Sequence, residues 1–182
     1  LFNLLRIPSI STDPAHRQDC DKAADWLVAD LKSIGFDASK RATPGHPMVI
    51  AYAGSEGPHV LFYGHYDVQP VDPLELWDNP PFEPALEETA KGVVIRGRGT
   101  SDDKGQAYVH VKAVEAFMQT NGRLPLNVKF IIEGEEEVGG DGGGAGKSRL
   151  STVLPLVLLT CRITIVVLFT LAALKSLGVD TT

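Results

Sequence analysis

A histidine and an aspartate two residues apart begin the part of this sequence that is suited to metal chemistry. His65 and Asp67 lie in the stretch Gly64-His65-Tyr66-Asp67-Val68-Gln69-Pro70, directly after the apolar, β-prone run 59–63. An imidazole binds zinc well, and its second ring nitrogen usually donates a hydrogen bond to a carboxylate that fixes the tautomer and the ring angle. The spacing therefore predicts His65 as a metal ligand and Asp67 as its orienting partner.

Two acidic clusters further along the chain could complete such a site. Asp102 and Asp103 are adjacent, and Glu136 and Glu137 end the acidic run 133–137. Carboxylates gathered at one edge of a sheet repel one another, so a cation is needed to offset the repulsion. One imidazole with several carboxylates suits zinc, manganese or cobalt better than magnesium or calcium. Two such ions bridged by a carboxylate make a water nucleophilic near neutral pH, and a further glutamate can take the proton of that water.

Each of these signals also has a structural interpretation. The run 133–137 could be a solvated acidic turn, which is how most charged runs are used. The pair Asp102 and Asp103 could simply cap the helix that follows. His59 and His110 have no acidic neighbours in the sequence, and we expect both to be structural. Taken one at a time, these residues do not decide between a metal site and the structural alternatives.

The elements that must carry these residues alternate between strands and helices. Apolar residues recur at helical spacing over 14–34 and 106–120, which predicts two amphipathic helices. Apolar, β-prone runs predict five strands, at 36–42, 47–53, 59–63, 93–96 and 126–132. Residues 70–90 are rich in proline, which favours an ordered loop over a helix or a central strand. The alternation predicts an α/β layered domain, in which chemistry collects at the carboxyl ends of strands.

Four motifs in a fixed order make a resemblance to a known family specific. They are Gly-His-Tyr-Asp-Val-Gln-Pro from Gly64, Trp-x-x-Pro-Pro-Phe-Glu-Pro from Trp77, Gly-Arg-Gly-Thr-Ser-Asp-Asp-Lys-Gly-Gln from Gly97, and Glu-Gly-Glu-Glu-Glu-Val-Gly-Gly from Glu133. Together they resemble the di-zinc metallopeptidases of the carnosinase, aminoacylase and succinyl-diaminopimelate desuccinylase family, and most closely its dipeptidase, carnosinase-like branch. The resemblance runs from about residue 1 to residue 140.

The resemblance implies a fold and a set of metal ligands. The fold is α/β, a three-layer mixed sheet with flanking helices, as in the zinc-peptidase catalytic domain. His65, Asp102 and Glu137 would be ligands of two zinc ions, which manganese or cobalt could replace. Asp102 would bridge the two ions, and the family joins it to Asp103 through a cis peptide.

The resemblance also implies a reaction. Asp67 would orient His65, and Glu136 would be the general base. The reaction would be metal-dependent hydrolysis of a dipeptide, or of a similar amide next to a free carboxylate, so the expected partner is a small peptide substrate. Intact relatives form homodimers, through a domain that this chain lacks.

The resemblance covers only part of the chain, which we divide into a partial metallopeptidase catalytic domain over 1–140 and a divergent, Gly-rich and apolar tail over 141–182. The family places another acidic ligand, a lid or dimerisation domain and a late histidine ligand downstream. The sequence has no acidic residue between Gly142 and Val179 and no histidine after His110. Each zinc would keep two of its usual three protein ligands. We therefore expect a truncated or frame-shifted product that binds metal weakly and has little or no activity.

The tail admits three interpretations, all centred on its apolar tract 153–174. This tract is long enough to span a bilayer, although Pro155 interrupts it and Arg162 costs about 2.5–3.5 kcal/mol on insertion. It could instead form a strand and a helix that extend the sheet, or a poorly ordered, aggregation-prone end. The Gly-rich segment 142–148 lacks the first glycine of a P-loop, because Asp141 occupies that position. A nucleotide-binding function is therefore disfavoured.

Composition limits the remaining classes of function. The chain has 182 residues, a net charge of −6 and dispersed Lys and Arg residues, so we expect no nucleic-acid partner. Cys20 and Cys161 lie far apart, which argues against a disulfide framework and a thiolate zinc site. No signal pattern precedes the first helix, and we expect a cytoplasmic protein. The alternative to an enzyme is a catalytically dead fragment that packs against a partner or a membrane through its apolar tail.

Overall fold

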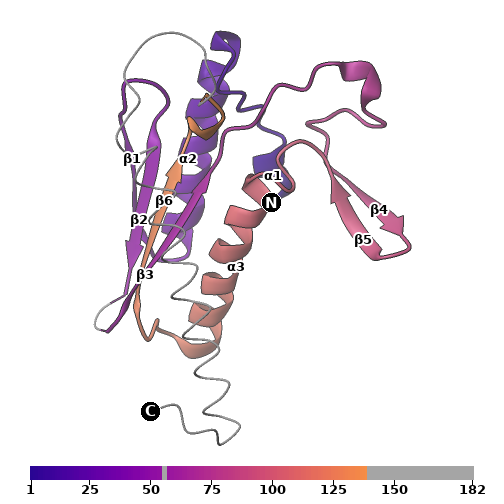
Figure 1. Cartoon of the computed structure of the whole chain (residues 1–182). Coiled ribbons are helices and arrows are strands. Elements are labelled where there is room, and N and C mark those ends of the chain that lie inside the picture. The colour runs from indigo at the N-terminus through magenta and orange to yellow at the C-terminus, as the bar shows by residue number, and fades with distance from the viewer. Residues whose placement is uncertain (55–56, 139–182) are drawn as a thin grey trace, which may run out of the picture. The chain divides into compact units, whose positions relative to one another are not determined.

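The computed structural model describes residues 1–54 and 57–138, and Figure 1 shows how their elements are arranged. The helices and short helical turns are α1 (Phe2–Leu5), η1 (Pro14–His16), α2 (Arg17–Ser33), η2 (Leu74–Leu76), α3 (Lys104–Asn121) and η3 (Glu136–Val138). The strands are β1 (Asp37–Arg41), β2 (Met48–Ala53), β3 (His59–His65), β4 (Ala85–Thr89), β5 (Gly92–Arg96) and β6 (Asn127–Glu133). The predicted alternation of strands and helices is confirmed.

Four strands form one mixed sheet in the order β1-β2-β6-β3. β2 is antiparallel to both β1 and β6, whereas β3 is parallel to β6. A parallel pair needs a long crossover, and the segment between β3 and β6 contains α3. The register places His65 opposite Glu133, so the carboxyl ends of β3 and β6 meet at one edge of the sheet. The mixed α/β class is therefore confirmed.

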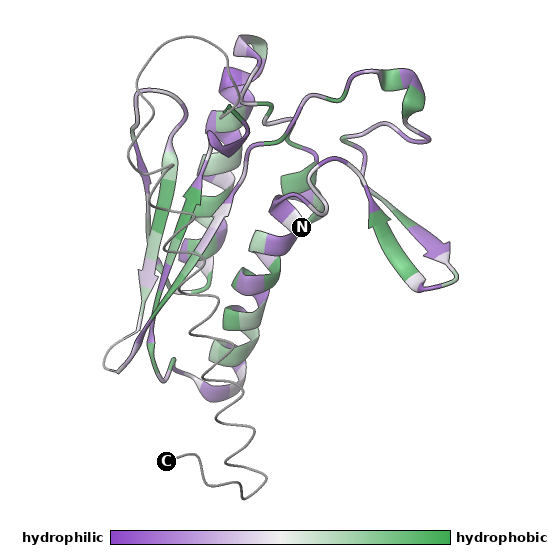
Figure 2. Ribbon diagram, viewed as in Figure 1, coloured by the Kyte–Doolittle hydropathy of each residue, from purple (hydrophilic) through white to green (hydrophobic). Residues whose placement is uncertain are grey.

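Both long helices cover the same face of the sheet. Alternate residues of β2 and β6 are buried, among them Val49, Ala51, Phe130 and Ile132, because successive side chains of a strand point to opposite faces. They pack against the buried stripe of α2 and α3, in the core cluster Leu4, Cys20, Ala23, Ala24, Leu27, Leu31, Phe36, Ala38, Val49, Ala51, Ala53, Tyr66, Tyr108, Val111, Val114, Leu124, Val128, Phe130 and Ile132. Figure 2 shows hydrophobic residues in green and hydrophilic residues in purple along both long helices. The described residues thus supply two of the three predicted layers.

The loop expected over 70–90 contains a strand, which corrects the prediction. β4 pairs with β5 in an antiparallel hairpin, with Thr89 opposite Gly92 in a tight turn where Gly92 has φ +110°. Both faces of this hairpin are largely exposed, and the polar residues of β4 hide the strand from a search for hydrophobic alternation. Figure 2 shows the contrast between a mainly hydrophobic β5 and a mainly hydrophilic β4.

The two long helices differ slightly from their predicted limits. α2 begins at Arg17 after the 3-10 turn η1, and α3 begins at Lys104, two residues before the predicted start. Lys104 is only 1% exposed, and a buried lysine is hard to recognise as part of a helical stripe. α3 ends at Asn121, one residue beyond the predicted end, and Gly122 then adopts the left-handed conformation with φ +72°.

The N-terminal segment packs beside the end of β3. Ile10 forms an isolated parallel bridge with Val68, the amide of Val68 donates to the carbonyl of Ser9 at 3.0 Å, and the Ser9 hydroxyl donates to the Tyr66 carbonyl at 2.7 Å. The Lys104 ammonium donates to two carbonyls of the same segment, in α1 and just after it. Residues 1–11 are therefore integrated into the fold around His65.

Several predictions fall outside the described residues. The domain boundary at 140/141 and the three interpretations of the tract 153–174 are among them. In 1–54 and 57–138, no helix combines the length and the apolar character that crossing a membrane requires.

Candidate metal centre

The predicted site residues converge where β3, the loop before α3 and η3 meet. We call His65, Asp67, Asp102, Asp103, Glu136 and Glu137 the metal rim. Gly64, the residue before His65, allows this convergence: a Cβ there would lie 2.7 Å from Asp103 Oδ2 and 3.0 Å from the Ala107 Cβ. A larger residue would push β3 away from the start of α3.

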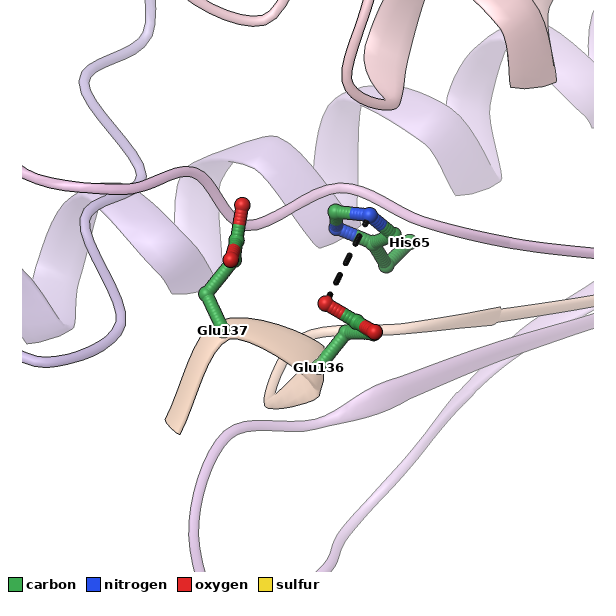
Figure 3. A group of neighbouring side chains, drawn as sticks. All are labelled: His65, Glu136 and Glu137. Atoms are coloured by element: carbon green, nitrogen blue, oxygen red, sulfur yellow. Dashed lines mark ion pairs between the residues drawn. The ribbon is translucent and has the colours of Figure 1, made fainter. Parts of the chain in front are cut away.

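His65 is 5% exposed, and the two nitrogens of its imidazole face different groups. Nδ1 lies 3.1 Å from the backbone carbonyl of Asp67 and 3.3 Å from its Oδ1. Nε2 lies 3.1 Å from Asp102 Oδ1 and 3.9 Å from Glu136 Oε2, an ion pair that Figure 3 shows. A proton on Nδ1 would leave Nε2 as the nitrogen that faces the carboxylates, which is the arrangement a metal ligand needs.

Asp67 is fully buried and serves several groups at once. Its Oδ2 accepts hydrogen bonds from the Ser11 hydroxyl at 2.6 Å and from the Glu137 amide at 3.0 Å. Burial by itself raises the pKa of Asp67, but the neighbouring His65 and the hydrogen bonds from Ser11 and the Glu137 amide outweigh it and hold the pKa below its usual range. Asp67 therefore stays ionised beside the imidazole, as an orienting partner must.

Asp102 and Asp103 are joined by the cis peptide that the family resemblance implies. The Asp102 side chain is 73% exposed and reaches His65 Nε2. Asp103 occupies the N-cap position of α3, but no capping hydrogen bond comes from its side chain. Instead, Asp103 Oδ2 accepts a hydrogen bond from the His65 amide at 3.1 Å. The capping alternative therefore does not account for either carboxylate.

The Glu136 carboxylate points toward His65 while staying partly open to solvent, and the Glu137 side chain lies beside them (Figure 3). One ligand atom from each of these three residues lies within 4.8 Å of the others. Gln69 Nε2 donates to Glu137 Oε2 at 2.5 Å, which ties η3 to the segment after β3. The acidic run therefore differs from a freely solvated turn.

The rim is crowded with negative charge. Burial lowers the pKa of His65, but the hydrogen bond and charge of Asp67, with the charges of Asp103 and Glu136, outweigh burial and raise the pKa to about 9. Burial and the neighbouring carboxylates raise the pKa of Glu136, against the opposing effect of His65. Burial is also the main reason why the pKa of Asp103 is raised. The carboxylate contributions to the shifts of His65 and Glu136 show that negative charges lie close together here.

This donor set fits a divalent cation. An imidazole nitrogen and several carboxylate oxygens are the ligands that zinc and manganese take in proteins. Lys104, the adjacent cation, is turned away: its Nζ donates to the Leu4 and Ile7 carbonyls at 3.2 and 2.6 Å. Among the described residues, the structure brings the ligand atoms of His65, Glu136 and Glu137 together, whereas Asp102 contacts His65 but lies outside this group of three. The separate roles assigned to these residues stay predictions.

Three contacts at the rim were not predicted from the sequence. Ser11 donates to Asp67, Gln69 donates to Glu137, and the Tyr63 hydroxyl donates to Glu133 at the end of β6. Gln69 lies inside a quoted motif, so its position was a usable signal. Ser11 lies more than fifty residues from its partner and carries no local signal. The structural reading of His110 is supported, because its ring stacks on Phe62 with centroids 4.7 Å apart.

Comparison with known proteins gives a consistent result. Residues 61–153 match the model of peptidase family M20/M25/M40. The cysteinylglycine-S-conjugate dipeptidase of Corynebacterium striatum is 34% identical over 133 residues, covering 71% of this chain and 28% of the relative. The Cys-Gly metallodipeptidase DUG1 of Saccharomyces cerevisiae is 32% identical over 154 residues, covering 76% of this chain and 32% of the relative.

Solved structures show the same similarity in three dimensions. The crystal structure of human carnosine dipeptidase 1 superposes with a TM-score of 0.66 and 32% identity, covering 76% of this chain and 31% of that chain. The chain thus spans less than a third of the length of these relatives.

Proposed function

Because the chain belongs to peptidase family M20/M25/M40, we propose that residues 1–138 carry the metal-binding and general-base part of a dipeptidase catalytic domain. The reaction is metal-dependent hydrolysis of a dipeptide or a similar amide next to a free carboxylate. The observation that supports it most is the meeting of His65, Glu136 and Glu137, whose ligand atoms lie within 4.8 Å of one another. The relatives named above are dipeptidases named for cysteinylglycine-S-conjugates, Cys-Gly and carnosine.

His65 Nε2, Asp102 and Glu137 would hold the cations, which are zinc or, alternatively, manganese or cobalt. When bound, such a cation polarises the scissile carbonyl and lowers the pKa of a water. Asp67 keeps the imidazole in one orientation, through the contacts on the Nδ1 side. Glu136 is half exposed at 47%, and its raised pKa suits it to take a proton from water and deliver it to the leaving amine.

We propose that this chain alone binds metal weakly and turns over slowly or not at all. Structural and catalytic zinc sites use at least three protein ligands for each ion. The described residues would offer each of two ions only two ligands, because Asp102 would be shared between them. A chain that has lost catalysis, and packs against a partner or a membrane through 153–174, is the alternative that the test must separate.

The test uses the full chain, purified and dialysed. Elemental analysis should find zinc or manganese bound in the wild type and lost in His65→Ala and Glu137→Ala. Hydrolysis of cysteinylglycine and carnosine should then rise when either metal is added. No metal above the background of the two variants, and no hydrolysis at any metal concentration, would refute the proposed activity and favour the alternative.

Two further parts of the proposal concern the protein in the cell. We place it in the cytoplasm, which fractionation of expressing cells would test. We also propose that longer proteins containing this domain assemble as homodimers, which sedimentation of such a protein would test.

A further inference from the structure

The hydroxyl of Ser11 makes the shortest hydrogen bond to the Asp67 carboxylate. Ser11 is 8% exposed and Asp67 is fully buried, so water does not compete freely for this contact. The distance from Ser11 Oγ to Asp67 Oδ2 is 2.6 Å, in the range of a charge-assisted hydrogen bond between a hydroxyl and a carboxylate. Within the described residues, Ser11 makes its hydrogen bonds to Asp67 and His46 and makes none to His65, Asp102 or Glu137.

The two oxygens of Asp67 have different surroundings. Oδ2 receives both the Ser11 hydroxyl and the Glu137 amide. Oδ1 has no hydrogen bond of good geometry within the described part of the chain, and it lies 3.3 Å from His65 Nδ1. Two donors on one oxygen prevent the carboxylate from rotating about its axis, which keeps the other oxygen beside the imidazole.

Three sets of contacts fix the backbone at and before Ser11. His46 Nε2 lies 3.0 Å from the Ser11 carbonyl, and His46 is also buried. The bridge between Ile10 and Val68 fixes the backbone of the preceding residue. Upstream, Lys104 holds the Leu4 and Ile7 carbonyls. The hydroxyl is therefore presented to Asp67 by a rigid segment.

We propose that Ser11 is a positioning residue of the metal rim. Its hydroxyl fixes the Asp67 carboxylate, and through it both the ring of His65 and the start of η3 at Glu137. One serine thus couples two ligands of a divalent cation that come from different strand ends. The effect on metal affinity rests on the proposed function, whereas the positioning of Asp67, His65 and Glu137 does not. Partners of this kind typically change metal affinity by about 10–100-fold when they are removed.

The metal test compares Ser11→Ala with Ser9→Ala in the full chain. Ser9 is a matched control, because it is also buried and also makes one hydrogen bond near His65, but to the Tyr66 carbonyl. Zinc affinity is measured by competition with a chromophoric chelator, after thermal unfolding has shown that both variants fold. Ser11→Ala should bind zinc about 10–100-fold more weakly, and Ser9→Ala should bind like the wild type. An unchanged affinity in Ser11→Ala, or an equal loss in both variants, would overturn the proposal.

A second test needs no metal and separates this inference from the proposed function. In chelator, Ser11→Ala should shift the ring nitrogen resonances of His65 and speed amide hydrogen exchange at Glu137, whereas Ser9→Ala should do neither. If the wild-type chain binds no zinc but these signals change only in Ser11→Ala, the metal function fails and the positioning role stands. If neither signal responds to Ser11→Ala, the positioning role is wrong.

Discussion

The metal rim and the β4–β5 hairpin are built in opposite ways. At the rim, the single residue Asp67 is contacted by Ser11, His65 and Glu137. The hairpin over 85–96 is held by the antiparallel pairing of its two strands and by an exposed ion pair between Arg96 and Glu87 at 2.6 Å. Its apolar side chains stay open to solvent, as Leu86 at 66% and Val93 at 64% exposed illustrate.

This contrast shows which part of the chain can keep a fixed geometry. Catalytic and metal-binding side chains must be held by packing and by hydrogen bonds from groups around them. An isolated two-stranded hairpin is only marginally stable in water, so it cannot supply such support. Five experiments test the contrast between the buried region around the rim and the exposed hairpin.

The largest difference between the region around the rim and the hairpin should be in the reactivity of a cysteine thiol. Burial raises the pKa of Cys20 to about 12, with a further contribution from Asp67, and its side chain is fully buried beneath the rim. In a Cys161→Ser background at pH 8.5, alkylation of Cys20 should be about three orders of magnitude slower than alkylation of an exposed thiol introduced by Glu88→Cys. Comparable rates at the two positions would show that the region beneath the rim opens as freely as the hairpin.

The raised pKa of Cys20 also predicts how the free energy of unfolding depends on pH. The reference pKa of the thiol is 9.0, and the folded state keeps the proton to about 12. The stabilisation from a protonated Cys20 is therefore fully present below pH 9 and is lost as the pH rises through 12. The decline in the free energy of unfolding over this range should be smaller in Cys20→Ala.

The next difference is in packing. Phe130 is 2% exposed and stacks on Phe62 with centroids 5.1 Å apart. Phe130→Ala should lower the free energy of unfolding in urea by about 3–5 kcal/mol, because it leaves a cavity in the core. Leu86→Ala in the hairpin should change it by less than about 0.5 kcal/mol. Equal losses would mean that the hairpin is packed as well as the core.

A smaller difference should follow from removing one lysine charge. Lys104→Met removes one donor from each of the Leu4 and Ile7 carbonyls, which keep only the amides of Ile7 and Ser9. The loss of these buried hydrogen bonds should lower the free energy of unfolding by about 1–3 kcal/mol. Lys91→Met, in the exposed hairpin turn, is the matched control and should be neutral. Urea unfolding monitored by tryptophan fluorescence measures both. A neutral Lys104→Met would show that the N-terminal segment needs no such anchor.

The smallest effect is expected within the hairpin itself. Glu87→Gln removes the partner of Arg96, but both groups are solvated and exposed ion pairs contribute little to stability. The melting temperature should therefore be the same as in the wild type, at low salt and at high salt. A clear, salt-dependent fall would contradict this view of the hairpin.

The metal rim was predictable from the sequence because its residues follow recognisable strands. His65 ends β3, Glu133 ends β6, and parallel strands bring their carboxyl ends to one edge. β4 was missed because a strand solvated on both faces shows no hydrophobic alternation. Ser11 was missed because a single serine carries no periodic signal, and its partner is set by the tertiary fold. Sequence patterns report burial well, and they report long-range hydrogen bonds poorly.

The anchoring of the first residues by Lys104 has a consequence for protein synthesis. The Lys104 ammonium group that donates to the Leu4 carbonyl lies 100 residues further along the chain. The Glu137 amide that completes the contacts of Asp67 lies 70 residues beyond it. A chain emerging from the ribosome amino end first therefore exposes its first helix, and the serines after it, until nearly all of the described residues have been translated. Contacts of such long range also slow folding.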